Sequence, residues 1–144
     1  MRLLMLLVLM LPILSFGSEE DKRRFEAKKV LAEQGDAMAQ LFLGIRYSNG
    51  TGVPKDDKEA AKWYRLAADQ GVAKAQYSLG SMYATGKGVP KDNLLAYMWT
   101  NIAGANGHDV EENMGIISGE MSQADIAKAQ EMTRQYIKDH PDVY

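Results

Sequence analysis

The sequence predicts an all-α protein: an α/α solenoid, or superhelix of helix-turn-helix repeats, with helical caps. Two observations carry this prediction. A stretch of 36 residues occurs twice in succession without a gap, and a fixed period of about 20–50 residues marks a stacked repeat array. Each copy also holds two segments of helical periodicity, separated by a glycine-rich turn that contains one proline.

The duplicated unit spans residues 35–70 and 71–106, and 16 of its 36 positions are identical in the two copies. The longest shared run is VPKD, at 53–56 and 89–92. The other identical pairs are Gly35/Gly71, Ala37/Ala73, Ala39/Ala75, Gln40/Gln76, Leu43/Leu79, Gly44/Gly80, Tyr47/Tyr83, Gly50/Gly86, Gly52/Gly88, Ala60/Ala96, Trp63/Trp99 and Ala67/Ala103. Most are residues suited to turns, helix caps and close packing, so we expect the shared positions to define the fold.

The first half of each unit predicts one helix, over residues 37–48 in the first copy. Asp36 can cap its N-terminus, and Ala39 and Leu43 recur four residues apart on one narrow face. Gly50 follows where a left-handed residue commonly ends a helix, since glycine adopts a positive φ without steric cost.

The second half of each unit predicts a second helix, capped by Asp56 with Glu59 completing a capping box. Its apolar stripe is Ala60, Trp63, Tyr64, Ala67 and Ala68, repeated as Ala96, Trp99, Thr100, Ala103 and Gly104. This spacing is that of an amphipathic helix. We therefore expect Trp63 and Trp99 in the core rather than in a ligand site.

The motifs of both copies resemble one known family. The pattern A-x-AQ-x₂-LG-x₂-Y-x₂-G-x-GV-x-KD, followed by A-x₂-WY-x₂-AA-x₂-G, is similar to the Sel-one-like repeat (SLR) family, a relative of the tetratricopeptide repeats. In the second copy Thr100 and Gly104 replace tyrosine and alanine, which indicates that the array is ending. The resemblance implies a small secreted bacterial protein that binds partners, usually on the concave face lined by the first helix of each repeat.

The segments on either side of the two copies predict helical caps. Residues 18–34 align with the second half of a repeat and predict an N-terminal half-repeat. Residues 107–144 predict a degenerate repeat with a C-terminal capping helix. In it we expect a short helix over 110–118 that covers Trp99, then a helix begun by Ser122.

The first 17 residues predict a secretory signal peptide ahead of a solenoid domain at 18–144. A basic start and an apolar run precede two small residues, Ser15 and Gly17, at the −3 and −1 positions of a cleavage site. The apolar run is shorter than the about 20 residues of a membrane span, although retention as an anchor stays open. We expect a periplasmic or secreted protein with no membrane insertion after cleavage.

Composition and motif spacing give little support to catalysis or to nucleic-acid binding. The net charge is −2, from 17 basic and 19 acidic residues, so a nucleic-acid partner has little electrostatic support and we expect none. His108 is expected in a turn between helices and His140 in the C-terminal tail. Neither has a second histidine at i+3 or i+4 or a carboxylate on a shared helix face, so we expect no metal site and no cofactor. The loop at 50–55 lacks the ending of a phosphate-binding loop.

The candidate binding surface lies where the two copies differ. The first helices diverge at Met38/Lys74, Leu41/Tyr77, Phe42/Ser78 and Ile45/Ser81. Because the shared residues hold the shape, these residues are candidates to set specificity for a peptide or protein on the concave face. For the four residues of the first copy, packing beneath the N-terminal cap is an equal alternative. Lys74 and Tyr77, one repeat deeper, are the stronger surface candidates.

The sequence favours a non-enzymatic protein–protein interaction module of the bacterial cell envelope. Two alternatives stay open: a secreted hydrolase, β-lactamase-like or acting on cell walls, and an inhibitor or assembly subunit of an envelope complex. Some cysteine-rich, secreted SLR proteins are assigned β-lactamase activity. This sequence has no cysteine and no S-x-x-K motif, so the resemblance does not carry that activity over.

Overall fold

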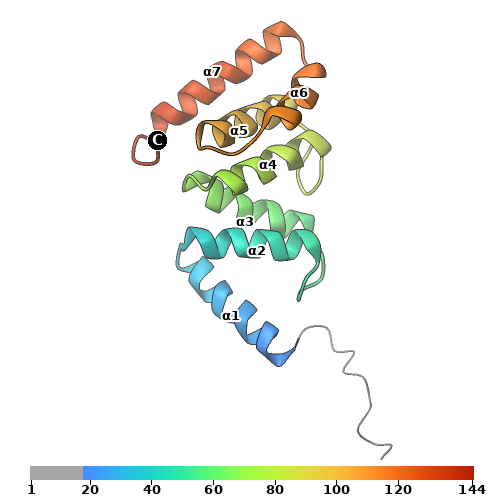
Figure 1. The fold of residues 1–144 in the computed structure, drawn as a ribbon, viewed down its shortest axis with the longest axis vertical. Coiled ribbons are helices and arrows are strands. Elements are labelled where there is room, and N and C mark those ends of the chain that lie inside the picture. Colours follow the sequence, from blue (N-terminus) through green and yellow to red (C-terminus); the bar gives the residue numbers. More distant parts are fainter. Residues whose placement is uncertain (1–17) are drawn as a thin grey trace, which may run out of the picture.

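The computed structural model describes residues 18–144, and the expected signal peptide at 1–17 lies outside the described residues. Within them the chain forms seven helices and no strand. The helices are α1 (Glu19–Glu33), α2 (Ala37–Asn49), α3 (Asp57–Asp69), α4 (Ala73–Thr85), α5 (Asn93–Ala105), α6 (Glu111–Gly119) and α7 (Gln123–Asp139). They follow one another along a single direction from α1 to α7 (Figure 1), which confirms the all-α repeat fold.

The helices pair as the duplication predicts. α2 packs on α3 and α4 packs on α5, and α3 and α4 join the two hairpins to each other. α1 packs on α2, and α7 packs on α5, so a helix covers each end of the array. None of the helices in residues 18–144 is both long enough and apolar enough to cross a bilayer.

Three aspartates begin helices at the positions that the repeat predicts. The side chains of Asp36, Asp56 and Asp92 each accept a hydrogen bond from a backbone N–H three residues later, at 2.7, 3.0 and 3.0 Å. Each bond satisfies a donor that a helix start leaves without a partner. Only one of the two hydrogen bonds of the capping box expected at Asp56 is present, the one from the Glu59 backbone N–H to the Asp56 side chain. The Glu59 carboxylate instead lies 3.6 Å from the Lys62 ammonium, whose charge attracts it away from the cap.

The glycines of the repeat have two separate roles. Gly50 and Gly86 end α2 and α4 in the left-handed conformation, with φ of 67° and 70°, as predicted. Gly44 and Gly80 instead allow the two helices of each repeat to approach closely. A Cβ on Gly44 would lie 2.5 Å from Tyr64 Cδ1. A Cβ on Gly80 would lie 2.5 Å from the side-chain oxygen of Thr100, on α5.

Both tryptophans lie in the core, as predicted: Trp63 is 6% exposed and Trp99 is fully buried. Trp63 packs with Phe25 and Leu43, in a cluster shared by α1, α2 and α3. The Trp99 ring meets the Tyr136 ring edge-on, with centroids 5.0 Å apart. The half-repeat α1 therefore closes one end of the core, and α7 closes the other.

The cover of Trp99 comes from α7 rather than from the segment at 110–118. Tyr136 of α7 and Arg65 of α3, whose guanidinium lies 5.1 Å from the ring, supply the contacts. The segment does fold as α6, but this helix has nine residues and its one buried residue is Ile117. Ile117 belongs to a separate cluster with Ala96 and Tyr97.

A buried amide pair recurs in both repeats. The Gln40 amide donates to the Ala32 carbonyl at 3.2 Å, and the Gln76 amide, 36 residues later, donates to the Ala68 carbonyl at 3.0 Å. Each glutamine carbonyl accepts in turn from an amide at the end of the following helix, Gln70 or Asn106. The shared glutamines thus tie each first helix to the second helices before and after it.

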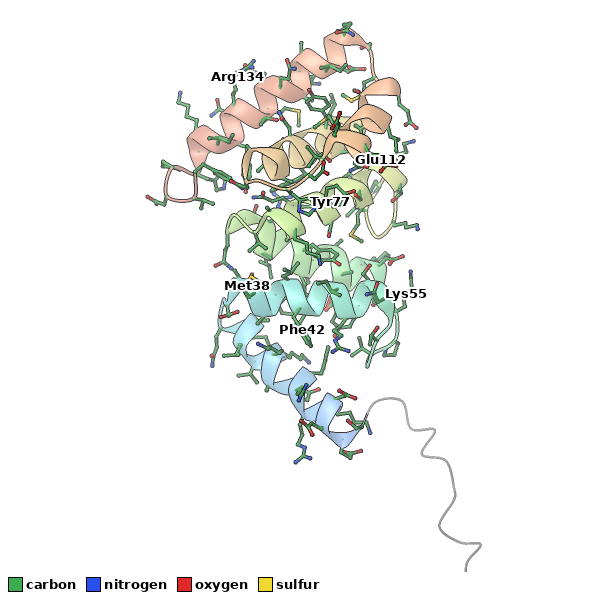
Figure 2. The ribbon with its side chains drawn as sticks, in the orientation of Figure 1. Met38, Phe42, Lys55, Tyr77, Glu112 and Arg134 are labelled. Atoms are coloured by element: carbon green, nitrogen blue, oxygen red, sulfur yellow. The ribbon has the colours of Figure 1, made fainter. Side chains whose placement is uncertain are left out.

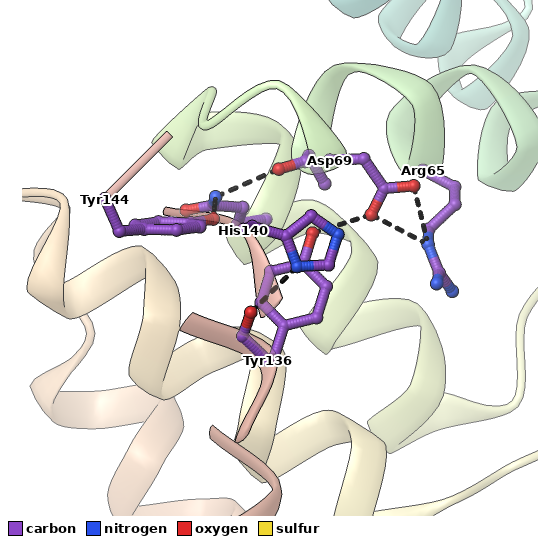
Figure 3. Close-up of polar contacts among 7 residues, drawn as sticks. Arg65, Asp69, Tyr136, His140 and Tyr144 are labelled. Atoms are coloured by element: carbon purple, nitrogen blue, oxygen red, sulfur yellow. Dashed lines mark hydrogen bonds and ion pairs between the residues drawn. The ribbon is translucent and has the colours of Figure 1, made fainter. Parts of the chain in front are cut away.

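The C-terminal residues reach back across two repeats, in an arrangement that we call the C-terminal staple: Tyr136, His140 and Tyr144 (Figure 3). The Tyr136 hydroxyl donates to the Asp69 carboxylate of α3 at 2.7 Å, and the Gln76 amide of α4 donates to the Tyr144 hydroxyl. The His140 ring stacks on the Tyr136 ring, with centroids 4.0 Å apart. The last helix is therefore fastened to the first full repeat as well as to the second.

Candidate functional site

The side of the array formed mainly by the first helices, α2, α4 and α6, carries three adjoining hollows of about 540, 300 and 260 Å³. Tyr77 lines the first and second hollows, and Asn113 lines the first and third. Ser81 and Thr85 line the second and third. Because these walls are shared, the hollows form one continuous surface, which we call the α4 groove.

Tyr77 lies where two of the hollows meet. Its ring is half-buried and lies 4.5 Å from the His108 ring, tilted by 40°. α4 holds it there because Ala75 and Leu79, on the opposite face of the helix, are buried in the core. Figure 2 shows Tyr77 of α4 and Glu112 of α6, which line the same hollow.

The second hollow is rich in hydroxyls, and Lys87 is the one charged residue among the described residues that line it. Burial raises the pKa of Tyr64 above its usual value, while hydrogen bonds with the Ser48 and Ser78 hydroxyls oppose that shift. The phenol therefore keeps its proton at ordinary pH and offers a hydroxyl rather than a charge. The Asn113 amide donates to the Ser81 hydroxyl at 3.4 Å, which links α6 to α4.

The end of the groove formed by α6 is acidic. Asp109, Glu111 and Glu112 line the 540 Å³ hollow, and Glu120 lines the 260 Å³ hollow. Glu120 lies 3.0 Å from the Lys91 ammonium, and the hydrogen bond between them lowers the pKa of that carboxyl. The other three carboxylates make no ion pair with any residue of 18–144.

The predicted surface residues of the second copy gather at this groove. Tyr77, Ser78 and Ser81 all line it, and all three are partly exposed. Lys74 is exposed on the first turn of α4, one turn before Tyr77, and does not line the hollows. The variable positions of α4 thus share the face that carries the groove.

The four residues predicted in the first copy are not brought together. Leu41 is only 6% exposed and lies in the central core, against which the half-buried Ile45 also packs. Phe42 packs with Phe25 of the cap helix, on the side of α2 toward α1 (Figure 2). Met38 is 62% exposed. Leu41 offers no accessible side chain, so we leave it out of the binding surface that we propose.

Sequence reasoning missed the part of the groove supplied by α6. Asn113 stands 36 residues after Tyr77, so it occupies the same variable position in the third, degenerate unit. Extending the repeat register by one more period finds Asn113. No spacing rule identifies Asp109, Glu111 or Glu112 as groove residues, because their place depends on how α6 packs.

The two histidines lie in different parts of the structure. His108 is next to Tyr77, and His140 Nδ1 lies 2.8 Å from the Tyr136 carbonyl oxygen in the staple. Within residues 18–144 no group of three or more His, Cys, Asp or Glu side chains is arranged to hold a metal ion. Nor does the His108 ring make a hydrogen bond to a described serine or carboxylate of the kind that a hydrolytic triad requires.

A further hollow, of about 580 Å³, lies between α1 and the first glycine loop, and Lys22, Val53 and Lys55 are among its lining residues. The glycine loop of the second repeat packs on the first repeat. The glycine loop of the first repeat has only α1 beside it, and this leaves the hollow open. A Cβ on Gly88 would collide with the Asp57 backbone. A Cβ on its counterpart Gly52 would meet only Arg46 Nη1, at 4.0 Å, so this hollow follows from the start of the array.

Comparison with known proteins identifies the repeat. The family model of the Sel1 repeat matches residues 37–72 and 73–108, two consecutive units of the same 36-residue period. The chain belongs to the Sel1 repeat family. This confirms the resemblance to the Sel-one-like repeats. The matched units place the first helix of a Sel1 repeat at α2 and at α4, the helices that border the groove.

Two solved structures show the same fold. One is a protective antigen present in uropathogenic Escherichia coli strains and displaying an SLR fold, with 34% identity and a TM-score of 0.80, covering 88% of this chain and 28% of that one. The other is a Sel1 repeat protein from Oxalobacter formigenes, with 35% identity and a TM-score of 0.66, covering 69% of this chain and 42% of that one. The chain thus spans less than half of either protein. No curated protein matches it significantly.

Proposed function

We propose that this Sel1 repeat chain is a non-enzymatic interaction module of the bacterial cell envelope that binds a peptide or partner protein in the α4 groove. Sel1 repeat proteins generally mediate protein–protein interactions. The observation that carries the proposal is the groove itself. It runs across several helices and is lined by residues in which the two repeats differ.

The shape and lining of the groove favour an extended segment over a small molecule. Three open hollows that adjoin one another suit several consecutive side chains, whereas small-molecule sites are usually single and largely enclosed. Tyr77 is a tyrosine at the meeting point of two hollows, and tyrosine is one of the residues that most often dominate binding energy at interfaces.

The envelope location rests on the sequence. The basic start, the apolar run and the small residues before position 18 support export, and the lack of cysteine removes any need for disulfide formation after it. A periplasmic or secreted array would meet its partner outside the cytoplasm. An N-terminal sequence determination on the protein from envelope fractions tests this part, with Ser18 expected as the first residue.

The binding test is affinity capture from an envelope extract with three forms of the protein. These are the unaltered chain, Tyr77→Ala, and Leu66→Ala as a control at an exposed apolar residue of α3 outside the groove. A partner retained by the unaltered chain and the control, and lost with Tyr77→Ala, supports the proposal when the melting temperatures agree. Capture that is indifferent to Tyr77 removes the groove from the proposal. Turnover of a β-lactam or cell-wall substrate, abolished by His108→Ala, overturns the non-enzymatic assignment.

A further inference from the structure

The acidic end of the α4 groove indicates the chemistry of what binds there. Asp109, Glu111 and Glu112 line its largest hollow, of about 540 Å³, together with Tyr77 and Asn113. Asp109 and Glu111 are held close together, because the Glu111 backbone N–H donates to the Asp109 carboxylate at 3.3 Å. Three like charges around one hollow repel each other, and a cation placed among them relieves that repulsion.

The position of these acids at a helix start does not account for their lack of cationic partners. Acidic residues favour the first turn of a helix because the helix dipole is positive there. In the first turn of α1, Glu19 and Glu20 have the same preference, yet each pairs with a cation, Lys22 or Arg24, at 2.9 Å. The acids of α6 instead face a hollow from which the cations of residues 18–144 are absent.

The aromatic wall of the hollow suits a cation as well. Tyr77 is half-buried beside His108, and it lines the same hollow as the carboxylates of Glu111 and Glu112. A guanidinium or ammonium group is attracted to the face of such a ring. Asn113 of α6 adds a polar group to the lining of this hollow.

We propose that the groove binds an extended peptide segment carrying an arginine or lysine, with the basic side chain in the 540 Å³ hollow. This inference rests on the proposed function and specifies the class of partner. The cation lies between Tyr77 and the carboxylates of Glu111 and Glu112. Arginine is preferred to lysine, because its planar guanidinium both stacks on an aromatic ring and donates to two carboxylate oxygens. The hydroxyl-rich second hollow, with Ser78 and Ser81, receives the neighbouring residues of the segment.

Fluorescence anisotropy with a defined probe tests the inference. The probe is a fluorescein-labelled peptide of alternating glycine and serine with two adjacent arginines at its centre, and its counterpart carries two glutamates instead. The protein is used unaltered, as the pair Glu111→Gln with Glu112→Gln, and as the matched pair Glu19→Gln with Glu20→Gln. Both pairs remove the same charge from the first turn of a helix, at opposite ends of the array.

The arginine probe is expected to bind the unaltered protein and the α1 pair alike, and to bind the α6 pair about tenfold more weakly. Added salt weakens the binding because the contacts are ionic and open to solvent. The inference is overturned if the glutamate probe binds as tightly as the arginine probe, or if the arginine probe does not bind. It is also overturned if the two double variants weaken binding equally. If the inference fails but capture of the envelope partner still depends on Tyr77, the proposed function stands without the preference for a basic segment.

Discussion

At the scale of single residues, the buried glutamines explain part of the repeat that spacing alone leaves unexplained. Gln40 and Gln76 are identical in the two copies, yet glutamine has no obvious place on a narrow apolar face. Both are buried, and both donate to the carbonyl of an alanine eight residues earlier. A buried polar group is stable only when it has hydrogen-bond partners, and the repeat supplies the same partners twice.

Replacing Gln76 by leucine is expected to lower the free energy of unfolding by about 1–3 kcal/mol, because the Ala68 carbonyl and the Asn106 amide lose their partner. Urea denaturation followed by circular dichroism measures the change. Gln135→Leu is the control, since Gln135 is exposed and a surface change of this kind stays within about 0.5 kcal/mol. Equal stability of the two variants would show that the amide network does not stabilise the fold.

Gly80→Ala is expected to destabilise the protein by about 1–3 kcal/mol, because the added methyl group meets both the side chain and the backbone of Thr100. Gly115→Ala is the matched change in α6, where nothing lies within 4 Å of the added carbon. That variant is expected to be more stable by about 0.5–1 kcal/mol, since alanine favours the helix over glycine. Melting curves of the two variants, shifted in opposite directions, would confirm this contrast.

At the scale of helices, local rules set where each one begins and ends. Asp36, Asp56, Asp92 and Ser122 cap helices where the sequence predicts, because a cap depends on residues three positions apart. How helices far apart in the chain meet is not local, so residue spacing does not predict it. The sequence predicts a C-terminal capping helix, which is α7, but nothing in the spacing shows that Tyr136 reaches Asp69.

The Tyr136 contact predicts a loss of stability at alkaline pH. Burial and the hydrogen bond to Asp69 raise the pKa of Tyr136, because a phenolate beside that carboxylate would be repelled. The folded protein thus holds this proton more tightly than the unfolded chain. Its contribution to stability is complete below the ordinary tyrosine pKa of about 10 and is lost as the pH rises above it.

Denaturation by urea at a series of pH values, on the unaltered protein and on Tyr136→Phe, measures this loss. The phenylalanine variant cannot titrate at this position, so its free energy of unfolding should fall less steeply above the pKa of free tyrosine. A residual slope is expected from Tyr144, whose pKa burial also raises. Parallel curves for the two proteins would refute the assignment.

At the scale of the whole molecule, the sequence predicts the architecture well and the binding surface in part. The period of 36 residues determines which helices pair, so the solenoid and its core tryptophans follow from it. Comparing the copies points to Tyr77, Ser78 and Ser81. It ranks Tyr77 above Leu41 at the same repeat position, but it does not show that Leu41 is buried, because that depends on how the helices pack.

The staple also predicts how cooperatively the array unfolds. A solenoid in which units touch only their neighbours can lose its repeats one after another. Here Tyr136 and Tyr144 fasten the last unit to α3 and α4, so we expect one transition. Fluorescence of Trp63 and Trp99, recorded separately in Trp→Phe variants, should report the same urea midpoint. Combining Tyr136→Phe with Tyr144→Phe should separate the two midpoints, and coincident curves after that change would argue against the staple.

The staple has a consequence for folding during synthesis. A chain that leaves the ribosome N-terminus first exposes α1 to α5 well before residues 136 and 144. The first two repeats can pair their helices as they emerge, because those contacts are local. The hydrogen-bond partners of Asp69 and of the Gln76 amide, Tyr136 and Tyr144, lie 67 and 68 residues further along the chain, so these bonds form later. Folding of this protein, on whichever side of the membrane the chain emerges, therefore ends with contacts that form only after Tyr136 and Tyr144 have emerged.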